Sequence, residues 1–265
     1  MPTSKDLFEL FFMGPGLICI LAVIVMAASS LWKARRKQKT DPASAAQLRQ
    51  DADRALRFGR LQEATELSQK AVAAASSHND RYLIAVAHLT YGKVAARAGD
   101  DETAREQFEL ARQHADQAVL AAFIRANLSL VLGRLRRVPE ALTMATEAVA
   151  AQAAITDPEA RPGAGWAHVA LALAQTDSGQ DGREAALRGL EIFREIEAEQ
   201  ARPWGESSAF ACYATAYAMR ATRDSSAAWY AAEAVASFSR LHLDVPSLYE
   251  RRLADAKRLE KELGQ

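Results

Sequence analysis

Small and apolar residues recur along this chain at intervals of three and four positions, the spacing of one face of an α-helix. The pattern is clearest in residues 85–98, where one face carries Ala85, Leu89, Gly92, Ala95 and Ala96. It resumes after a short break, in residues 101–116, with Ala104, Phe108, Ala111 and Ala115. Small residues at these positions allow two helices to approach closely. The pattern therefore predicts a hairpin of two helices.

The break between these helices has the residues of a helix end followed by a helix start. Gly99 can take the left-handed conformation that closes a helix. Asp100 or Asp101 can then cap the next helix by accepting hydrogen bonds from its free backbone N–H groups. One such hairpin cannot bury its own apolar face, so it needs neighbours of the same kind.

The same layout recurs along the chain. Gly59 and Ala64 have the spacing of Gly99 and Ala104, and the corresponding alanines, 37 to 44 residues apart, are Ala64, Ala104, Ala141, Ala185 and Ala228. The predicted helix pairs are 42–58 with 60–77, 81–98 with 101–116, 118–135 with 138–154, 165–178 with 181–198, and 205–222 with 225–241. Residues 156–165 contain two prolines and two glycines and predict the longest break, with a bend in the array.

This repeat resembles the tetratricopeptide repeat (TPR), in which small and large apolar positions alternate on two antiparallel helices. Its period is longer than the usual value of about 34 residues and is more similar to that of kinesin light chains and large bacterial transcription activators. The resemblance covers residues 45–242 and is strongest in the first three repeats. It implies an all-α fold, an α-solenoid of about five TPR-like helix pairs.

A final helix is predicted over residues 247–263. Ser247 and Glu250 have the spacing of a capping box at its start. Its many charged residues suit a solvated C-terminal capping helix that closes the open end of the stack.

A long apolar segment precedes the repeats. Residues 17–31 contain no charge, and residues 10–32 exceed the roughly 20 residues that a membrane span needs. A signal peptide cleaved near residues 27–29 is the alternative. It is less favoured because residues 1–6 carry little positive charge, the apolar run is too long, and basic residues follow at once. The sequence therefore predicts a retained N-terminal transmembrane helix that reaches the lipid bilayer through residues 10–32.

The residues after this segment orient it. The predicted membrane-interface residues are Trp32, Lys33, Arg35, Arg36, Lys37 and Lys39. Because basic clusters stay on the cytoplasmic side, we expect an N-terminus outside and a cytoplasmic repeat domain, in a single-pass protein of a bacterial inner membrane. The cluster either fixes topology alone or also binds anionic headgroups. The predicted parts are residues 1–32, the basic segment 33–41, the solenoid 42–242 and the capping helix 243–265.

Composition argues against several classes of function. Lys and Arg number 33, as do Asp and Glu, so no excess of positive charge favours a nucleic-acid partner. Cys19 and Cys212 have neither disulfide nor metal spacing, and the five histidines lie in separate predicted helices or at helix ends. No phosphate-binding loop or catalytic constellation is present. We therefore expect a chain that is not an enzyme and has no metal site and no small-molecule cofactor.

The TPR resemblance implies that the first helix of each pair lines a concave groove. The residues at groove positions are Arg49, Asp53, Arg57, Lys93, Arg97, Asn127, Arg134, Trp166, Tyr213 and Tyr217. One half of this groove is basic and the other aromatic, which suits a peptide with acidic residues and a hydrophobic anchor. Alternatively, the cations are ordinary solvated side chains and the tyrosines belong to the core, as we expect for Phe210. Of the chaperone-tail clamp known in some relatives only Asn127 is in place, so that ligand is not supported.

These features predict a membrane-anchored scaffold or adaptor. It would recruit or hold a protein partner at the cytoplasmic face, as an accessory subunit of a membrane complex. Two other functions fit the same sequence. One is an exported periplasmic TPR protein in envelope assembly or chaperoning, and the other is a regulatory sensor that binds a peptide or small ligand.

Overall fold

The computed structural model describes residues 42–155, 157–200 and 205–264. Within these ranges the chain forms eleven α-helices and a short 3-10 turn, and no strand. The helices are α2 (Pro42–Arg57), α3 (Leu61–Ser76), α4 (Arg81–Ala98), α5 (Asp101–His114), α6 (Ala118–Arg134), α7 (Val138–Ala153), α8 (Arg161–Asp177), α9 (Arg183–Gln200), α10 (Glu206–Ala221), α11 (Ala227–Asp244) and α12 (Pro246–Leu263). The predicted all-helical solenoid is confirmed. The predicted transmembrane helix and the basic segment that follows it lie outside the described residues.

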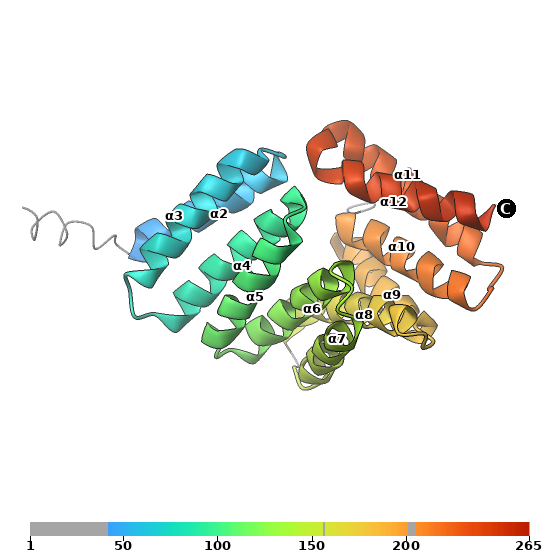
Figure 1. Cartoon of the computed structure of the whole chain (residues 1–265), viewed down its shortest axis with the longest axis horizontal. Helices are drawn as coiled ribbons and strands as arrows, with labels where there is room; N and C mark the ends of the chain where they lie inside the picture. The colour runs from blue at the N-terminus through green and yellow to red at the C-terminus, as the bar shows by residue number, and fades with distance from the viewer. Residues whose placement is uncertain (1–41, 156, 201–204, 265) are drawn as a thin grey trace, which may run out of the picture. The chain divides into compact units, whose positions relative to one another are not determined.

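Consecutive helices pack as hairpins, and each hairpin packs on the next (Figure 1). The pairs are α2–α3, α4–α5, α6–α7, α8–α9 and α10–α11, with α12 against α11. The first helices of neighbouring pairs also contact one another, from α2 through α10. Most of the buried side chains in these contacts are alanine, so the helices lie close together over a narrow apolar seam.

One residue in the turn within each pair has a left-handed backbone. These residues are Gly59, Gly99, Arg136, Gly179 and Arg223. Glycine adopts this conformation without steric cost, whereas arginine does not. Helix packing therefore imposes the turns at Arg136 and Arg223, which no local glycine signal announces.

The alanines that mark the repeats are buried in most pairs. Ala64, Ala104 and Ala141 are fully buried. In the last pair, however, Ala227 is buried and Ala228 is exposed. The predicted fifth marker, Ala228, is thus wrong by one position. In the first three pairs the buried alanine lies five positions after the left-handed residue, whereas Ala227 lies four positions after Arg223.

Two glycines that look like helix breakers lie within α8. A Cβ on Gly163 would lie 2.6 Å from the side-chain amide nitrogen of Gln152, and one on Gly165 would lie 2.7 Å from the ring of Phe193. Both glycines are buried in contacts with neighbouring helices. The predicted break over residues 156–165 is therefore wrong in its second half: α8 begins at Arg161, with proline in its first turn, where proline is tolerated.

Helix α12 does more than cap the stack, because it also contacts the first helix pair. The Ser247 hydroxyl donates a 3.0 Å hydrogen bond to the Gly59 carbonyl, 188 residues earlier. A Cβ on Gly59 would lie 2.5 Å from Cγ1 of Val245, so the two turns touch closely. The predicted capping box is wrong, since Val245 occupies the N-cap position and no side-chain cap forms there. The turns of α2–α3 and α11–α12 thus meet (Figure 1).

The prediction of a solvated α12 is also wrong for one of its faces. The buried residues of this helix are Leu248, Tyr249, Leu253, Ala256 and Leu259. Leu248, Tyr249 and Leu253 belong to the same apolar cluster as Leu56 and Val94 of the first two pairs. The apolar face of α12 therefore packs inside the array of helices rather than facing solvent at its end.

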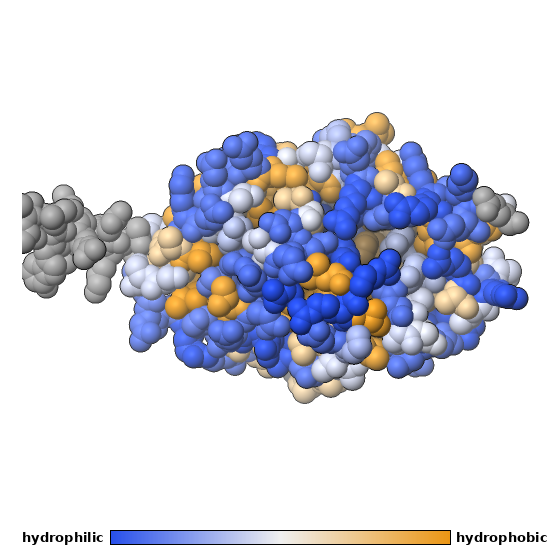
Figure 2. Space-filling model, in the orientation of Figure 1, coloured by the Kyte–Doolittle hydropathy of each residue, from blue (hydrophilic) through white to orange (hydrophobic). Residues whose placement is uncertain are grey.

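The surface of the described helices is mixed in polarity. Figure 2 shows one face on which hydrophilic residues predominate and apolar residues form separate areas. None of the helices that the structure describes combines the length and hydropathy required to cross a membrane.

Candidate functional site

A cavity of about 700 Å³ lies between the first helices of the repeats and α12. Seven of the ten predicted groove residues line it: Lys93, Arg97, Asn127, Arg134, Trp166, Tyr213 and Tyr217. They come from α4, α6, α8 and α10, which the sequence assigned to one face. Helix α12 supplies a further wall that the sequence did not predict.

The three predicted groove residues of α2 do not line this cavity. Arg49 and Asp53 pair with each other at 3.1 Å, and Asp53 lies 3.6 Å from the Lys93 ammonium group. Arg57 is exposed. Arg49 and Asp53 therefore form a charged chain with Lys93 beside the cavity. The residue that α2 contributes to the lining is Leu56, which was not among those predicted.

Four aromatic side chains form a continuous ladder along the cavity wall. Trp166 lies 5.7 Å from Phe210, Phe210 lies 5.8 Å from Tyr213, and Tyr213 lies 6.2 Å from Tyr217, measured between ring centroids. These side chains are only partly buried, whereas the alanines between them on α10 are fully buried. The ladder therefore presents its rings to the cavity, and Phe210, which we expected in the core, is a member of it.

Two guanidinium groups, one from α12 and one from α10, lie against this ladder. Arg252 of α12 lies 4.6 Å from the centroid of the Phe210 ring, and Arg220 lies 4.6 Å from that of Tyr217. Such cation–π contacts hold an arginine over a ring while leaving its hydrogen-bond donors available. At the Tyr217 end the phenol donates a 2.7 Å hydrogen bond to Asp177. The cavity wall thus combines ring faces with arginine edges.

Positive charge predominates around the cavity. Its eight basic lining residues are Lys93, Arg97, Arg134, Arg136, Arg220, Arg251, Arg252 and Arg258, and its four acidic ones are Asp177, Glu206, Asp255 and Glu262. The lining residues therefore carry four more positive than negative charges. The excess falls to two when Asp101, which pairs with Arg134 and Arg251, and Asp53, which pairs with Lys93, are included. A concave, partly apolar wall with this excess attracts anionic groups.

Glu206 lies at the centre of a polar cluster in the cavity. It accepts hydrogen bonds from Arg97 of α4 and Arg252 of α12, and from the Tyr249 hydroxyl at 3.2 Å. Burial opposes ionisation of this carboxyl group, but Arg252 and Arg97 outweigh burial and hold the pKa of Glu206 at about 2. Burial and the nearby Arg97 lower the pKa of Arg252 to about 10, so it stays protonated at neutral pH. Two cations therefore share one carboxylate.

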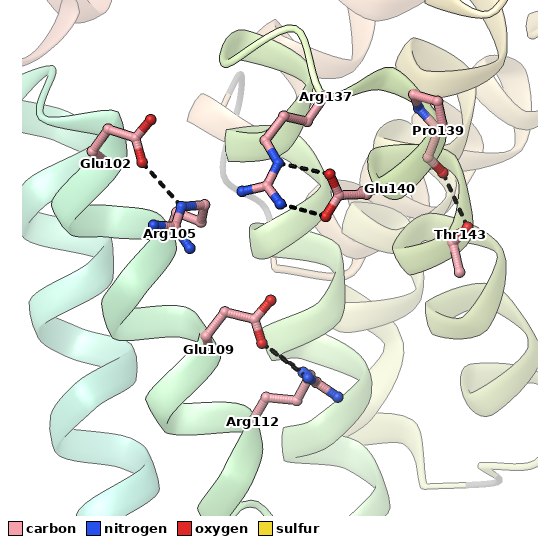
Figure 3. A network of polar contacts seen from close by, with 8 residues as sticks. All are labelled: Glu102, Arg105, Glu109, Arg112, Arg137, Pro139, Glu140 and Thr143. Carbon is pink, nitrogen blue, oxygen red and sulfur yellow. Dashed lines mark hydrogen bonds and ion pairs between the residues drawn. The ribbon is translucent and has the colours of Figure 1, made fainter.

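The charged residues on the outer surface are arranged differently from those in the cavity. On α5, and at the N-cap of α7, arginines pair with carboxylates three positions away, as in Glu102–Arg105, Glu109–Arg112 and Arg137–Glu140 (Figure 3). Such exposed pairs stabilise a helix only weakly. These residues behave as a solvated helix face, whereas Arg97 and Arg252 of the cavity come from different helices and converge on Glu206.

Asn127 does not act as a free amide in the cavity. Its side-chain nitrogen donates a 2.9 Å hydrogen bond to the Phe123 carbonyl of its own helix. Asn127, the one residue that matched the chaperone-tail clamp, therefore already uses one of its side-chain N–H donors within its own helix.

Sequence reasoning missed the contribution of α12 and of Glu206. The many charged residues of α12 indicated a solvated surface. Its apolar residues, at intervals of three and four, nevertheless indicated one buried face. Glu206 carries no local signal, because its partners are 109 and 46 residues away.

A second hollow of about 950 Å³ lies between α8, α9 and α11. Two arginines line it, Arg188 and Arg194, and Arg188 pairs with Glu191 on the same helix. His168 faces it, and burial lowers the pKa of this histidine below its ordinary value. This hollow lacks the aromatic ladder and the excess of positive charge, so the first cavity is the better candidate site. No group of three or more possible metal ligands occurs within the described helices and turns.

Comparisons with known proteins define the fold. A chain from Podosopora anserina, assigned as a kinesin light chain with nearly identical TPR-like repeats, matches with a TM-score of 0.51 and 20% identity, over 76% of this chain and 98% of that one. The protein BtubC (BKLC) from P. vanneervenii matches with a TM-score of 0.53 and 19% identity, over 91% of each chain. No protein-family model and no curated protein sequence matches.

These similarities place the chain in the class of α-solenoids with TPR-like repeats. The resemblance seen in the sequence is thereby confirmed at the level of fold, including the likeness to long kinesin light chain repeats.

Proposed function

We propose that this chain is a non-catalytic scaffold that binds a protein partner in the cavity between its first helices and α12. The observation that carries this proposal is the convergence of the aromatic ladder and an excess of positive charge on one concave wall. Solenoids of stacked helix pairs commonly use such concave surfaces for binding.

The cavity chemistry favours an acidic partner segment with an aromatic or large apolar side chain. The rings of Trp166, Phe210 and Tyr213 offer faces on which an apolar side chain can stack. Arginine donates to carboxylates in a planar, two-pronged geometry, and the cavity arginines stand beside these rings. A peptide bearing both features would use the two kinds of wall together.

The site of action that we propose is the cytoplasmic face of a bacterial inner membrane. This part of the proposal is supported by the sequence alone, through the apolar residues 10–32 and the basic residues that follow them. The repeat domain begins at Pro42, directly after this segment, so the scaffold would act close to the bilayer as an accessory subunit of a membrane complex.

A photo-cross-linking experiment tests the binding cavity. With the full chain in its native membranes and p-benzoylphenylalanine in place of Tyr217, we expect one dominant cross-linked partner, detected by mass spectrometry. The paired Arg134→Glu and Arg220→Glu substitutions should reduce this product at least about tenfold, because they reverse two charges of the wall.

Leu110 on α5 provides the matched control. It is partly exposed on a second helix and does not line the cavity. The same photoreactive residue at position 110 should give no such product. A partner that cross-links from position 110 but not from 217, or whose product survives both charge reversals, would contradict the cavity as the binding site.

Reporter fusions test the predicted topology. Green fluorescent protein fused after Gln265 should fluoresce, and alkaline phosphatase at the same position should be inactive, because the basic residues after Trp32 retain the C-terminal side in the cytoplasm. An active phosphatase with a dark fluorescent fusion would instead support the exported, periplasmic alternative.

A further inference from the structure

We propose that the position held by Glu206 is a carboxylate-binding site, at which an acidic side chain of the partner competes with Glu206 for Arg97 and Arg252. The inference deepens the proposed function, on which it rests for the identity of the competitor. It names the point in the cavity where the negative charge of the partner is recognised.

Donors from two distant parts of the chain converge on this one carboxylate. Arg97 comes from the second repeat, and Arg252 and Tyr249 come from the last helix. The side chains of Arg97, Arg252 and Glu206 are 21%, 20% and 24% exposed, so the cluster borders the cavity rather than lying sealed in the core. A carboxylate arriving through the cavity can therefore reach the same donors.

The cluster has more donor capacity than its own carboxylate uses. Two guanidinium groups face a single acid, and Arg97 keeps a buried nitrogen, Nη1, that has no hydrogen-bond partner among the described residues. A buried donor without a partner is costly, so an additional or better placed carboxylate is favoured at this point. The Phe210 ring beneath Arg252 holds that guanidinium in place for either acid.

The Glu206 carboxylate can also be displaced from Arg97 and Arg252 without disrupting its own helix. It is the first residue of α10, where the backbone N–H has no intrahelical partner. Its carboxylate is held by side chains of other helices and contributes no cap to α10. Replacing it by an external carboxylate would therefore leave α10 intact and keep α12 joined to α4.

Acetate, the smallest carboxylate, provides the first test. The full chain in detergent is unfolded thermally at pH 7 in 100 mM sodium acetate and in 100 mM sodium chloride. We expect acetate to raise the Tm of Glu206→Ala by about 3 °C over chloride, because the ion occupies the vacated position. Wild type and the double variant Glu206→Ala/Arg252→Ala should shift by less than about 1 °C.

Glu262→Ala is the matched control, since Glu262 also lines the cavity but pairs with one arginine, Arg220. Its Tm should not respond to acetate. An equal acetate response in this control, or no response in Glu206→Ala, would show that acetate does not recognise the Arg97–Arg252 pair and would overturn the inference.

The second test measures competition and does not depend on Glu206→Ala being folded. The probe is an acetylated peptide of four glutamates followed by phenylalanine amide, titrated by calorimetry at low salt. The isosteric Glu206→Gln variant should bind it about ten times more tightly than wild type, because the internal competitor has lost its charge. Equal affinities would overturn the competition.

The two proposals fail in different ways. If acetate and peptide have no effect but position 217 still cross-links to a partner, the carboxylate site is wrong and the scaffold function stands. If acetate restores Glu206→Ala and Glu206→Gln binds the peptide more tightly, but no cross-link forms in the cavity, the carboxylate site stands and the proposed function is wrong.

Discussion

The Phe108→Ala substitution is expected to lower the free energy of unfolding by about 3–5 kcal/mol, the usual cost of removing a buried aromatic ring. Phe108 is 1% exposed and packs into the space left by Gly92 on the facing helix. Gly92→Ala should in turn cost about 1–3 kcal/mol, because the new Cβ would lie 2.5 Å from the Phe108 ring and force it to move. Chemical denaturation followed by circular dichroism measures both effects.

A double variant tests whether the contact between residue 92 and the Phe108 ring causes the loss of stability in Gly92→Ala. In Gly92→Ala/Phe108→Leu the smaller side chain makes room for the new methyl group, so the combined loss should be smaller than the sum of the single losses by at least about 0.5 kcal/mol. Gly133→Ala is the matched control, since a Cβ there meets only Asp177, at 3.8 Å. It should stabilise the protein by about 0.5–1 kcal/mol. Additive losses, or a destabilising Gly133→Ala, would refute the close packing described at Gly92.

The Glu206→Gln substitution is expected to lower the free energy of unfolding by about 2–3 kcal/mol at pH 7. It keeps the shape of the side chain and leaves Arg97 and Arg252 without their counter-charge. Breaking a fully buried pair costs about 3–5 kcal/mol, and the partial exposure of this cluster reduces that value. Glu262→Gln, which removes an exposed ion pair with Arg220, should change stability by less than about 0.5 kcal/mol.

The difference between wild type and Glu206→Gln should depend on pH. The folded protein holds the pKa of Glu206 at about 2, below its ordinary value of 4.5. A carboxyl group with a lowered pKa stabilises the fold above its ordinary pKa, and this contribution is lost as the pH falls through the folded value. The gap between the two proteins should therefore be constant above about pH 5 and shrink between about pH 4.5 and pH 2. A gap that persists unchanged at pH 2.5 would contradict the ionised cluster.

Several features were predictable because they depend on neighbouring positions. The helices of the first two pairs begin and end within one or two residues of prediction, where turn signals such as Gly59, Gly99 and Asp100 flank clear periodic segments. The third pair agrees as closely although its turn at Arg136 has no glycine, because proline lies in the first turn of α7. The turn at Arg223 lacks such a signal, and the marker alanine of that pair was misplaced by one residue.

Glycines carry two meanings that local reasoning does not separate. At Gly59 and Gly99 the backbone is left-handed and glycine ends a helix. At Gly163 and Gly165 it is helical, and the glycine leaves room for Gln152 and Phe193 of other helices. The side chain that needs the space is remote in the sequence, so these glycines were mistaken for a loop.

The candidate site was likewise predictable from the sequence only in part. Register along each first helix was enough to bring Lys93, Arg97, Arg134, Trp166 and Tyr217 to one cavity. It failed for α2, whose residues Arg49 and Asp53 lie beside that cavity, and for α12, which turns back to the first repeat through Ser247.

By itself the sequence determined the class of fold, the order of the helix pairs and most of the side chains on the concave face, because periodicity and turn chemistry act over a few residues. Only the tertiary structure decided that α12 closes one wall of the cavity and that Glu206 receives both Arg97 and Arg252. Those contacts join residues up to 188 positions apart. These contacts depend on the total rotation between the first and the last helix pair, which is the sum of small rotations from each alanine-lined pair to the next. No local sequence pattern specifies this total rotation.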